Sequence, residues 1–273
     1  MGSGTAFASY KRRKNWRLEA MKNKMLFALP NLFTITSIVF GVYAMIRVAG
    51  AAGPNDFIWA VVALAFSVMC DMMDGRVARL TRTASEFGVQ LDSLADLVAF
   101  GVAPAIVFYN WALKDLGIAG IAAAAMFVVC GALRLARFNV MAGKHKGVLR
   151  HFTGLPIPAA ASFICSVVLL EAYSNGAPAL SSGQMLVLVV ITSYLMISNI
   201  RFRTFKDARP SPASFSLFVL IAFCSTYVGT TFSVPVMLFG MATTYVVLGL
   251  VEEVVFFRAR RRAEVDDSDE QIA

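Results

Sequence analysis

Apolar runs long enough to cross a membrane recur along almost the whole chain. They cover residues 27–49, 56–75, 88–111, 117–137, 155–174, 183–201, 213–230 and 233–257. A hydrocarbon core of about 30 Å needs roughly 20 apolar residues in a helix, and only helices or closed barrels can pair all their backbone polar groups there. Charged residues make up only 15% of the chain, against about 25% in soluble domains. We therefore predict an all-α, polytopic transmembrane helical bundle of about eight spans.

The basic residues predict how these spans are oriented. With the N-terminus inside, only Arg47 and Lys114 of the 25 Lys and Arg residues fall on the outer side, as the positive-inside rule requires. Six spans remain an alternative, because the turn at residues 229–233 is very short. The eight-span reading places both termini on the cytoplasmic side of the inner (cell) membrane. The net charge of +8 then follows from topology and needs no nucleic-acid partner.

The pattern divides the chain into four parts. A basic cytoplasmic segment at 1–24 precedes a membrane core at 25–210, which holds the first six spans. Two further helices occupy 211–257, and a charged cytoplasmic tail follows at 258–273.

Four aspartates stand beside these apolar runs in the stretch CDMMDGRVARLTRTASEFGVQLDSLADLVAFGVAP. An acidic residue at the centre of a spanning helix costs about 2.5–3.5 kcal/mol on insertion scales, so these side chains should avoid lipid. Asp71 and Asp74 are spaced i, i+3, and Asp92 and Asp96 are spaced i, i+4, which puts each pair on one helix face. Because the pairs flank a predicted inner loop, two antiparallel helices can bring all four together.

Clustered carboxylates repel one another, and protons or cations must compensate that repulsion. An all-oxygen ligand set favours a hard cation such as Mg²⁺ or Mn²⁺, and four carboxylates suffice for two ions about 3.5–4 Å apart, an arrangement suited to phosphoryl chemistry. The alternatives are a buried ion-pair network that locks the helices together and a cation pathway in a transporter. A pathway needs polar residues through the whole bilayer, whereas the outer halves of the spans are almost wholly apolar, with Glu171 the main exception.

The aspartates and their neighbours follow the spacing Asp71–x2–Asp74–Gly75–x2–Ala78–Arg79–x8–Gly88–x3–Asp92–x3–Asp96. This pattern resembles, position for position, the signature of the CDP-alcohol phosphatidyltransferase family. The resemblance implies that Asp71, Asp74 and Asp92 hold two divalent metals over the pyrophosphate of a CDP-linked lipid. It implies two roles for Asp96, as a metal ligand and as the general base that deprotonates the acceptor hydroxyl.

Other residues of the signature are candidates for binding the CDP-lipid, Ala78 among them. Gly75 and Gly88 have no side chain, so a nucleotide can pack against their backbone; close helix packing is the alternative. Arg79 can reach a phosphate with two donors, or it can extend its charge to the membrane surface.

The resemblance extends over about residues 25–210 and is most similar to the integral-membrane phosphatidylserine synthases of that family. The similar stretches are LPNLFTITSIVFGVYA, SEFGVQLDSLADLVAFGVAPA, GALRLARFNV and FTGLPIPAAA. In the first stretch, Asn31 and Thr34 fall at family positions for the CDP-lipid, while Ser37 stands where Asn is common. The resemblance implies a homodimer that transfers a phosphatidyl group from CDP-diacylglycerol to L-serine and releases CMP. Glycerol 3-phosphate, inositol phosphate and choline are the alternative acceptors.

A pair of arginines closes the fourth apolar run. Arg134 and Arg137 are spaced i, i+3, with Asn139 just beyond. We predict that they clamp an anionic group, either the serine carboxylate or the lipid phosphate; ordinary inner-side topology charges are the alternative. Thr153 begins a stiff Gly- and Pro-containing turn into the fifth run, which we predict to be a wall of the acceptor pocket.

Overall fold

Long apolar helices make up most of the described chain in the computed structural model, which describes residues 30–81, 85–144, 152–174, 180–202 and 233–250. Among these described residues, four helical segments are long and apolar enough to cross a membrane: Pro30–Ala49, Pro54–Ala78, Glu86–Leu116 and Ile118–Met141. The same part of the chain holds three shorter apolar helices, Ile157–Tyr173, Ser182–Ile197 and Val234–Leu250. These confirm the predicted all-α membrane bundle. The predicted terminal segments and the span at 213–230 lie outside the described residues, so the count of eight stays a prediction.

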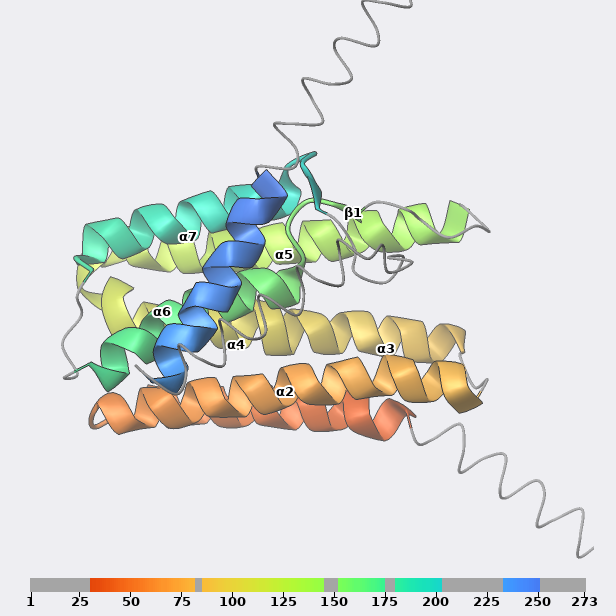
Figure 1. Ribbon diagram of the computed structural model, residues 1–273, viewed down its shortest axis with the longest axis horizontal. Helices are drawn as coiled ribbons and strands as arrows, with labels where there is room; N and C mark the ends of the chain where they lie inside the picture. Colours follow the sequence, from red (N-terminus) through yellow and green to blue (C-terminus); the bar gives the residue numbers. More distant parts are fainter. Residues whose placement is uncertain (1–29, 82–84, 145–151, 175–179, 203–232, 251–273) are drawn as a thin grey trace, which may run out of the picture.

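Nearly all secondary-structure elements of the described chain are helical (Figure 1). The first helix, Pro30–Ala49, is followed by these elements: α2 (Pro54–Thr81), α3 (Glu86–Asp96), η1 (Leu97–Val102), α4 (Ala103–Phe108), η2 (Tyr109–Leu113), η3 (Lys114–Leu116), α5 (Ile118–Lys144), β1 (Phe152–Thr153), α6 (Ile157–Tyr173), α7 (Ser182–Ile197) and β2 (Arg201–Phe202). Val234–Leu250, which we call the last helix, ends the described chain.

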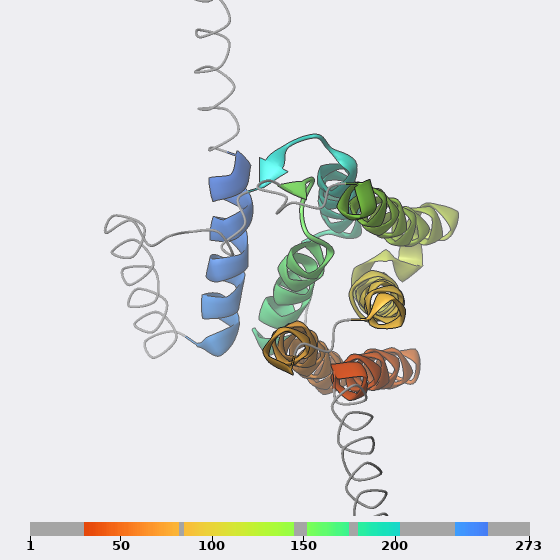
Figure 2. The same ribbon diagram turned by 90° about the vertical axis from the view of Figure 1, so that its right-hand side faces the viewer.

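The helices of the described chain lie side by side as a bundle (Figure 2), and apolar side chains are found both in its interior and on its exterior. Within it, α5 packs against α7, and α2 packs against α6. Phe108 and Phe127 meet edge to face inside the bundle, with ring centroids 5.3 Å apart. Large apolar side chains also point outward, among them Ile46 and Met69. Apolar residues on every side of a helix are typical of a membrane span.

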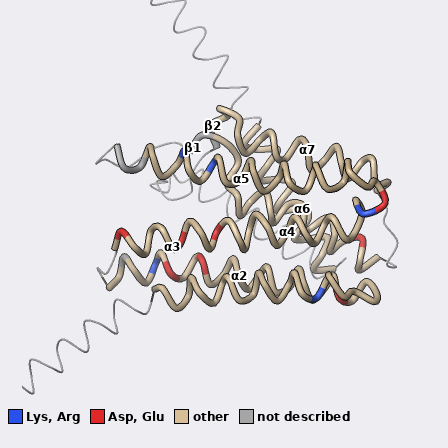
Figure 3. Tube along the Cα trace, turned by 180° about the vertical axis from the view of Figure 1, so that it is seen from behind, with Lys and Arg blue, Asp and Glu red and all other residues tan. Residues whose placement is uncertain are grey.

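Charged residues of the described chain lie toward the two ends of the bundle, with a stretch that lacks Lys, Arg, Asp and Glu between them (Figure 3). At the end away from the four aspartates, Arg47 pairs with Asp56 at 2.7 Å. Glu171 is buried there and accepts hydrogen bonds from Trp111 Nε1 (2.6 Å) and from the Leu180 backbone N–H (2.8 Å). Glu171, the acidic residue that the sequence singled out in the outer halves of the spans, therefore connects η2 to the residues just before α7, which is a structural role.

The start and end of α3 place its aspartates. Ser85 caps the helix by accepting a hydrogen bond from the Gly88 N–H at 3.0 Å, a bond typical of an N-cap. The π-helical segment η1 begins directly after Asp96. Such π-helical turns widen a helix locally and occur often at functional sites.

Candidate metal centre

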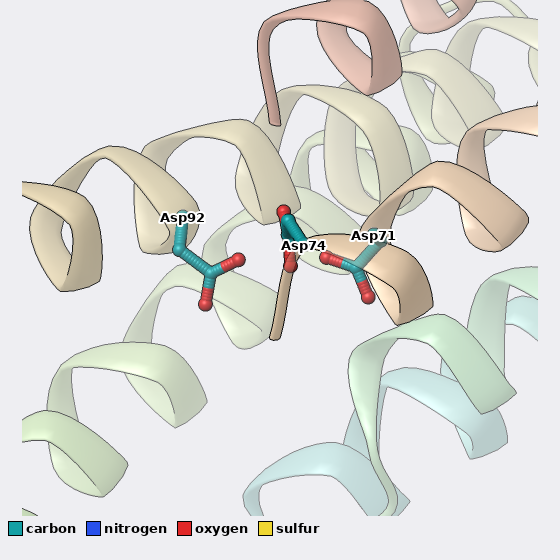
Figure 4. A group of neighbouring side chains, drawn as sticks. All are labelled: Asp71, Asp74 and Asp92. Carbon is teal, nitrogen blue, oxygen red and sulfur yellow. The ribbon is translucent and has the colours of Figure 1, made fainter. Parts of the chain in front are cut away.

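Three aspartates from two helices converge at one place. Asp71 and Asp74 lie on α2 and Asp92 lies on α3, and one carboxylate oxygen of each lies within 4.8 Å of the others. Figure 4 shows the three carboxylates turned toward a common space between the two helices. The predicted meeting of the two pairs across the loop is confirmed for these three residues, and their role as metal ligands stays a prediction.

Asp96 lies beside this cluster, one helical turn beyond Asp92. It interacts electrostatically with Asp71, Asp92 and Arg134. Its Oδ1 atom is buried and has no hydrogen-bond partner among the described residues. A buried polar atom without a partner costs about 1–3 kcal/mol, so this oxygen is suited to a cation or to a donor on a bound substrate.

The donor set decides which cations fit. The converging ligand atoms are carboxylate oxygens, which suit hard divalent cations such as Mg²⁺ and Mn²⁺. Like charges packed this closely destabilise one another unless a cation or proton compensates them. The residues present therefore fit a divalent metal centre.

Thr34 orients one of these carboxylates. Its hydroxyl donates to Asp74 Oδ2 at 2.8 Å, and both side chains are buried, with 4% and 6% exposed. Sequence reasoning assigned Thr34 to the CDP-lipid and missed this contact, since the two residues are far apart in the chain. A hydrogen bond to a ligating carboxylate fixes its orientation and tunes metal affinity.

The Thr34→Val variant tests this positioning role. Val keeps the shape but removes the hydroxyl, so Asp74 loses its buried donor. We expect the concentration of Mn²⁺ needed for half-maximal activity, and the Kd for Mn²⁺ measured by titration, to rise about 10- to 100-fold. The matched control is Thr36→Val on the same helix, where the hydroxyl donates to the Leu32 carbonyl (2.7 Å). Identical Mn²⁺ titrations for the two variants would show that Thr34 does not support the metal centre.

The predicted CDP-lipid residues surround the cluster on two sides. A Cβ atom built on Gly88 would lie 3.4 Å from Asn31 Oδ1, so the start of the first helix meets the start of α3 there. Gly75 and Ala78 are half-buried on α2 just after Asp74. The side chain of Arg79 lies outside the described part. Contact of these residues with a nucleotide stays a prediction.

The two arginines of the predicted clamp lie in different surroundings. Arg134 is 8% exposed and lies near Asp96, and its Nε has no hydrogen-bond partner among the described residues. Arg137 donates to the carbonyls of Ile197 and Ser198, each at 3.2 Å. Arg137 thus binds carbonyls at the C-terminal end of α7, a common contact for a basic side chain. Of the two, Arg134 is the one placed against the acids.

Asn139 and Thr153 take part in contacts between segments. The Asn139 amide donates to Ser93 Oγ at 2.9 Å, which joins α5 to α3 beside Asp92.

Thr153 pairs with Arg201 through the backbone of β1 and β2. The next residue, Gly154, has φ +85° and donates its N–H to the Ile200 carbonyl at 2.8 Å. A side chain at Gly154 would collide with the Met196 carbonyl, so this turn requires glycine. The side chain of Thr153 is outside the described part, and its place in an acceptor pocket stays a prediction.

Sequence reasoning missed a contribution from the last helix. Tyr245 is half-buried and lies near Arg134. The sequence assigned this helix no chemical role, because a lone tyrosine in an apolar run carries no spacing signal.

Comparison with known proteins agrees with this geometry. Residues 27–195 match the CDP-alcohol phosphatidyltransferase family. A CDP-diacylglycerol–serine O-phosphatidyltransferase of Helicobacter pylori is 39% identical over 196 residues, which cover 72% of this chain and 79% of that protein. A protein of the same name from Bacillus subtilis is 35% identical over 65% of this chain and 91% of its own length. The archaetidylserine synthase of Methanothermobacter thermautotrophicus is 39% identical over 64% and 69% respectively. The match spans both helices that carry the converging aspartates, and the chain belongs to the CDP-alcohol phosphatidyltransferase family.

Proposed function

We propose that this protein is a membrane enzyme that transfers the phosphatidyl group of CDP-diacylglycerol to L-serine and releases CMP. The observation that carries the proposal is the convergence of Asp71, Asp74 and Asp92 from two helices of a chain in this family. Serine is proposed as the acceptor because relatives from Helicobacter pylori and Bacillus subtilis are named as serine transferases.

The four aspartates would hold two divalent cations, Mg²⁺ or Mn²⁺. When bound, such ions neutralise pyrophosphate charge and stabilise the leaving CMP. Asn31, Thr34, Gly75, Ala78, Arg79 and Gly88 would bind the CDP-lipid around this centre. The close approach of Asn31 to Gly88 supports this grouping, since it places the first helix beside the signature.

Asp96 would act as the general base. Its buried, unpartnered Oδ1 can accept the proton of the serine hydroxyl, whose oxygen then attacks the β-phosphorus while the bond to CMP breaks. An alcohol with a pKa far above 7 needs such a base, and this help is worth about 10²–10⁴ in rate. Arg134 lies near Asp96 and would pair with the serine carboxylate. The pocket for the acceptor would be supported further by Arg137, Asn139 and Thr153.

The two arginines should respond differently to replacement by alanine. Arg134→Ala should raise the KM for serine roughly 10- to 100-fold, because a charge-assisted hydrogen bond worth about 1.5–3 kcal/mol is lost. Arg137→Ala should instead lower the melting temperature with a smaller change in KM, because it loses its contacts with the end of α7. Steady-state kinetics and thermal unfolding in detergent measure both quantities. A wild-type serine KM in Arg134→Ala, combined with weaker CDP-diacylglycerol binding, would assign Arg134 to the lipid phosphate.

The proposal includes the placement of the protein. We propose the inner (cell) membrane, with both termini and the active site on the cytoplasmic side, and a homodimer as the assembly. Residues 25–210 would form the catalytic core, followed by two helices at 211–257. The concentration of Lys and Arg residues on the predicted inner side supports this orientation. Reporters fused before Lys11 and after Ala273 should both report a location on the cytoplasmic side of the membrane.

A panel of acceptors tests the function directly. Purified full-length protein would receive CDP-diacylglycerol, Mn²⁺ or Mg²⁺, and labelled serine, glycerol 3-phosphate, inositol phosphate or choline. We expect phosphatidylserine and an equal amount of CMP. Preference for glycerol 3-phosphate would overturn serine as the acceptor but keep the phosphatidyl transfer. Absence of CMP release with every acceptor would overturn the transfer itself.

A further inference from the structure

An apolar cavity of about 110 Å³, partly open to the outside of the bundle, lies between α2, the η1–α4 region, α6 and the last helix. Its lining includes Val68 on α2, Ala99 on η1, Cys165 on α6, and Leu238 and Ala242 on the last helix. The last helix crosses beside α6 in both views (Figures 1 and 2). The residues matched by the family end at 195, so this helix lies outside the matched segment.

One end of the cavity lies next to the candidate metal centre. Val68 is one helical turn before Asp71, and Ala99 is one turn after Asp96. A turn of α-helix advances about 5.4 Å along the axis. The lining then continues away from the acids to Val61 on α2, about two further turns along that helix. The cavity therefore runs from the acidic cluster toward the middle of the bundle.

A single face of the last helix serves both the cavity and the polar site. Leu238, Ala242 and Tyr245 are spaced i, i+4 and i+7, which places them on one helix face. The first two line the cavity, and Tyr245 lies near Arg134. Phe239 stacks on Phe163 of α6, with ring centroids 6.4 Å apart, and holds the helix against the bundle.

The chemistry of the cavity selects its occupant. A polar ligand would lose hydrogen bonds to water without regaining them along an apolar lining. An engineered apolar cavity of about 150 Å³ binds benzene, so this cavity can hold a segment of hydrocarbon chain. A lipid whose headgroup sits at the acids extends its chains in the direction of the cavity.

We propose that this cavity holds a segment of one acyl chain of the lipid substrate, and that Leu238 and Ala242 determine which chains are accepted. The proposal rests on the proposed function for the identity of the lipid. It gives the last helix a role in substrate specificity.

Photo-crosslinking tests the proposal on the unmodified protein. CDP-diacylglycerol carrying a diazirine on one acyl chain would be bound to the full-length protein, irradiated, and mapped by mass spectrometry. We expect adducts on α6 and on the last helix near Leu238 and Ala242, displaced by excess unlabelled CDP-diacylglycerol. Adducts confined to outward-facing residues such as Met241, which is 46% exposed, would overturn it.

Chain-length dependence tests the specificity role. Ala242→Phe fills the cavity, and we expect at least a roughly tenfold higher KM for dipalmitoyl CDP-diacylglycerol, as for other changes of pocket volume. The KM for the dihexanoyl analogue should rise less, because its shorter chain fills less of the cavity, and turnover of this lipid also shows that the variant folds. Met241→Phe is the matched control on the outward side and should match the wild type with both lipids. Equal losses with both lipids, or none with either, would overturn the role of Ala242.

A second variant and the crosslinking separate this inference from the proposed function. Leu238→Ala enlarges the cavity and should lower the KM for a branched-chain lipid relative to the dipalmitoyl lipid; an unchanged ratio would count against the role of Leu238. If the wild type bound CDP-diacylglycerol but transferred nothing to any alcohol, the proposed function would fail. The crosslinking map would still confirm or overturn the cavity assignment, because it requires binding alone.

Discussion

The Asp71→Asn variant is expected to lose phosphatidyl transfer by at least about 10²–10³-fold while remaining folded, the cost typical of removing one preorganised charge-stabilising group. Asn keeps the shape of the side chain but removes the negative charge from a cluster whose oxygens lie within 4.8 Å of one another. Asp74→Asn and Asp92→Asn should behave alike. Initial rates of labelled serine incorporation and of CMP release measure the loss.

The matched control for these variants is Asp115→Asn. Asp115 is exposed on η3, at the end of the bundle away from the cluster, and its replacement should leave the rate unchanged. Treatment with a chelator should abolish the activity of the wild-type protein, and addition of Mn²⁺ or Mg²⁺ should restore that activity. A well-folded Asp71→Asn protein with near-normal activity would overturn the metal-centre proposal.

The Asp96→Asn variant should separate binding from chemistry. The amide keeps one oxygen for a cation but cannot accept the acceptor's proton, so the rate of transfer should fall by at least about 10²-fold. Binding of CDP-diacylglycerol should stay within a few-fold of the wild type, because loss of a group needed in the transition state lowers the rate rather than the affinity. Single-turnover kinetics and a lipid-binding titration give the two numbers.

Two outcomes would contradict the role of Asp96 as base. A near-normal rate in single turnover would show that another group removes the proton. A parallel loss of Mn²⁺ affinity and rate, both restored by excess Mn²⁺, would reduce Asp96 to a metal ligand. The Asp115→Asn protein serves as the control here as well.

The sequence alone was enough to predict the bundle and the acidic cluster. Apolar runs of spanning length leave a membrane chain few choices other than helices, and helical spacing decides which face a residue occupies. Asp71 and Asp74 share a face of α2 for this reason, and the short connection to α3 brings Asp92 beside them. Both steps depend on local geometry, and local geometry can be read from spacing.

Only the tertiary structure decided which distant residues support that cluster. Thr34 donates to Asp74, Arg134 faces the acids while Arg137 binds the end of α7, and the last helix completes an apolar cavity beside them. Each of these contacts depends on how two helices, distant in sequence, are rotated and packed against each other. In a chain that is 58% hydrophobic, nearly every helix face is apolar, so hydrophobic periodicity does not specify that rotation. Side-chain packing and a few buried polar contacts specify it instead.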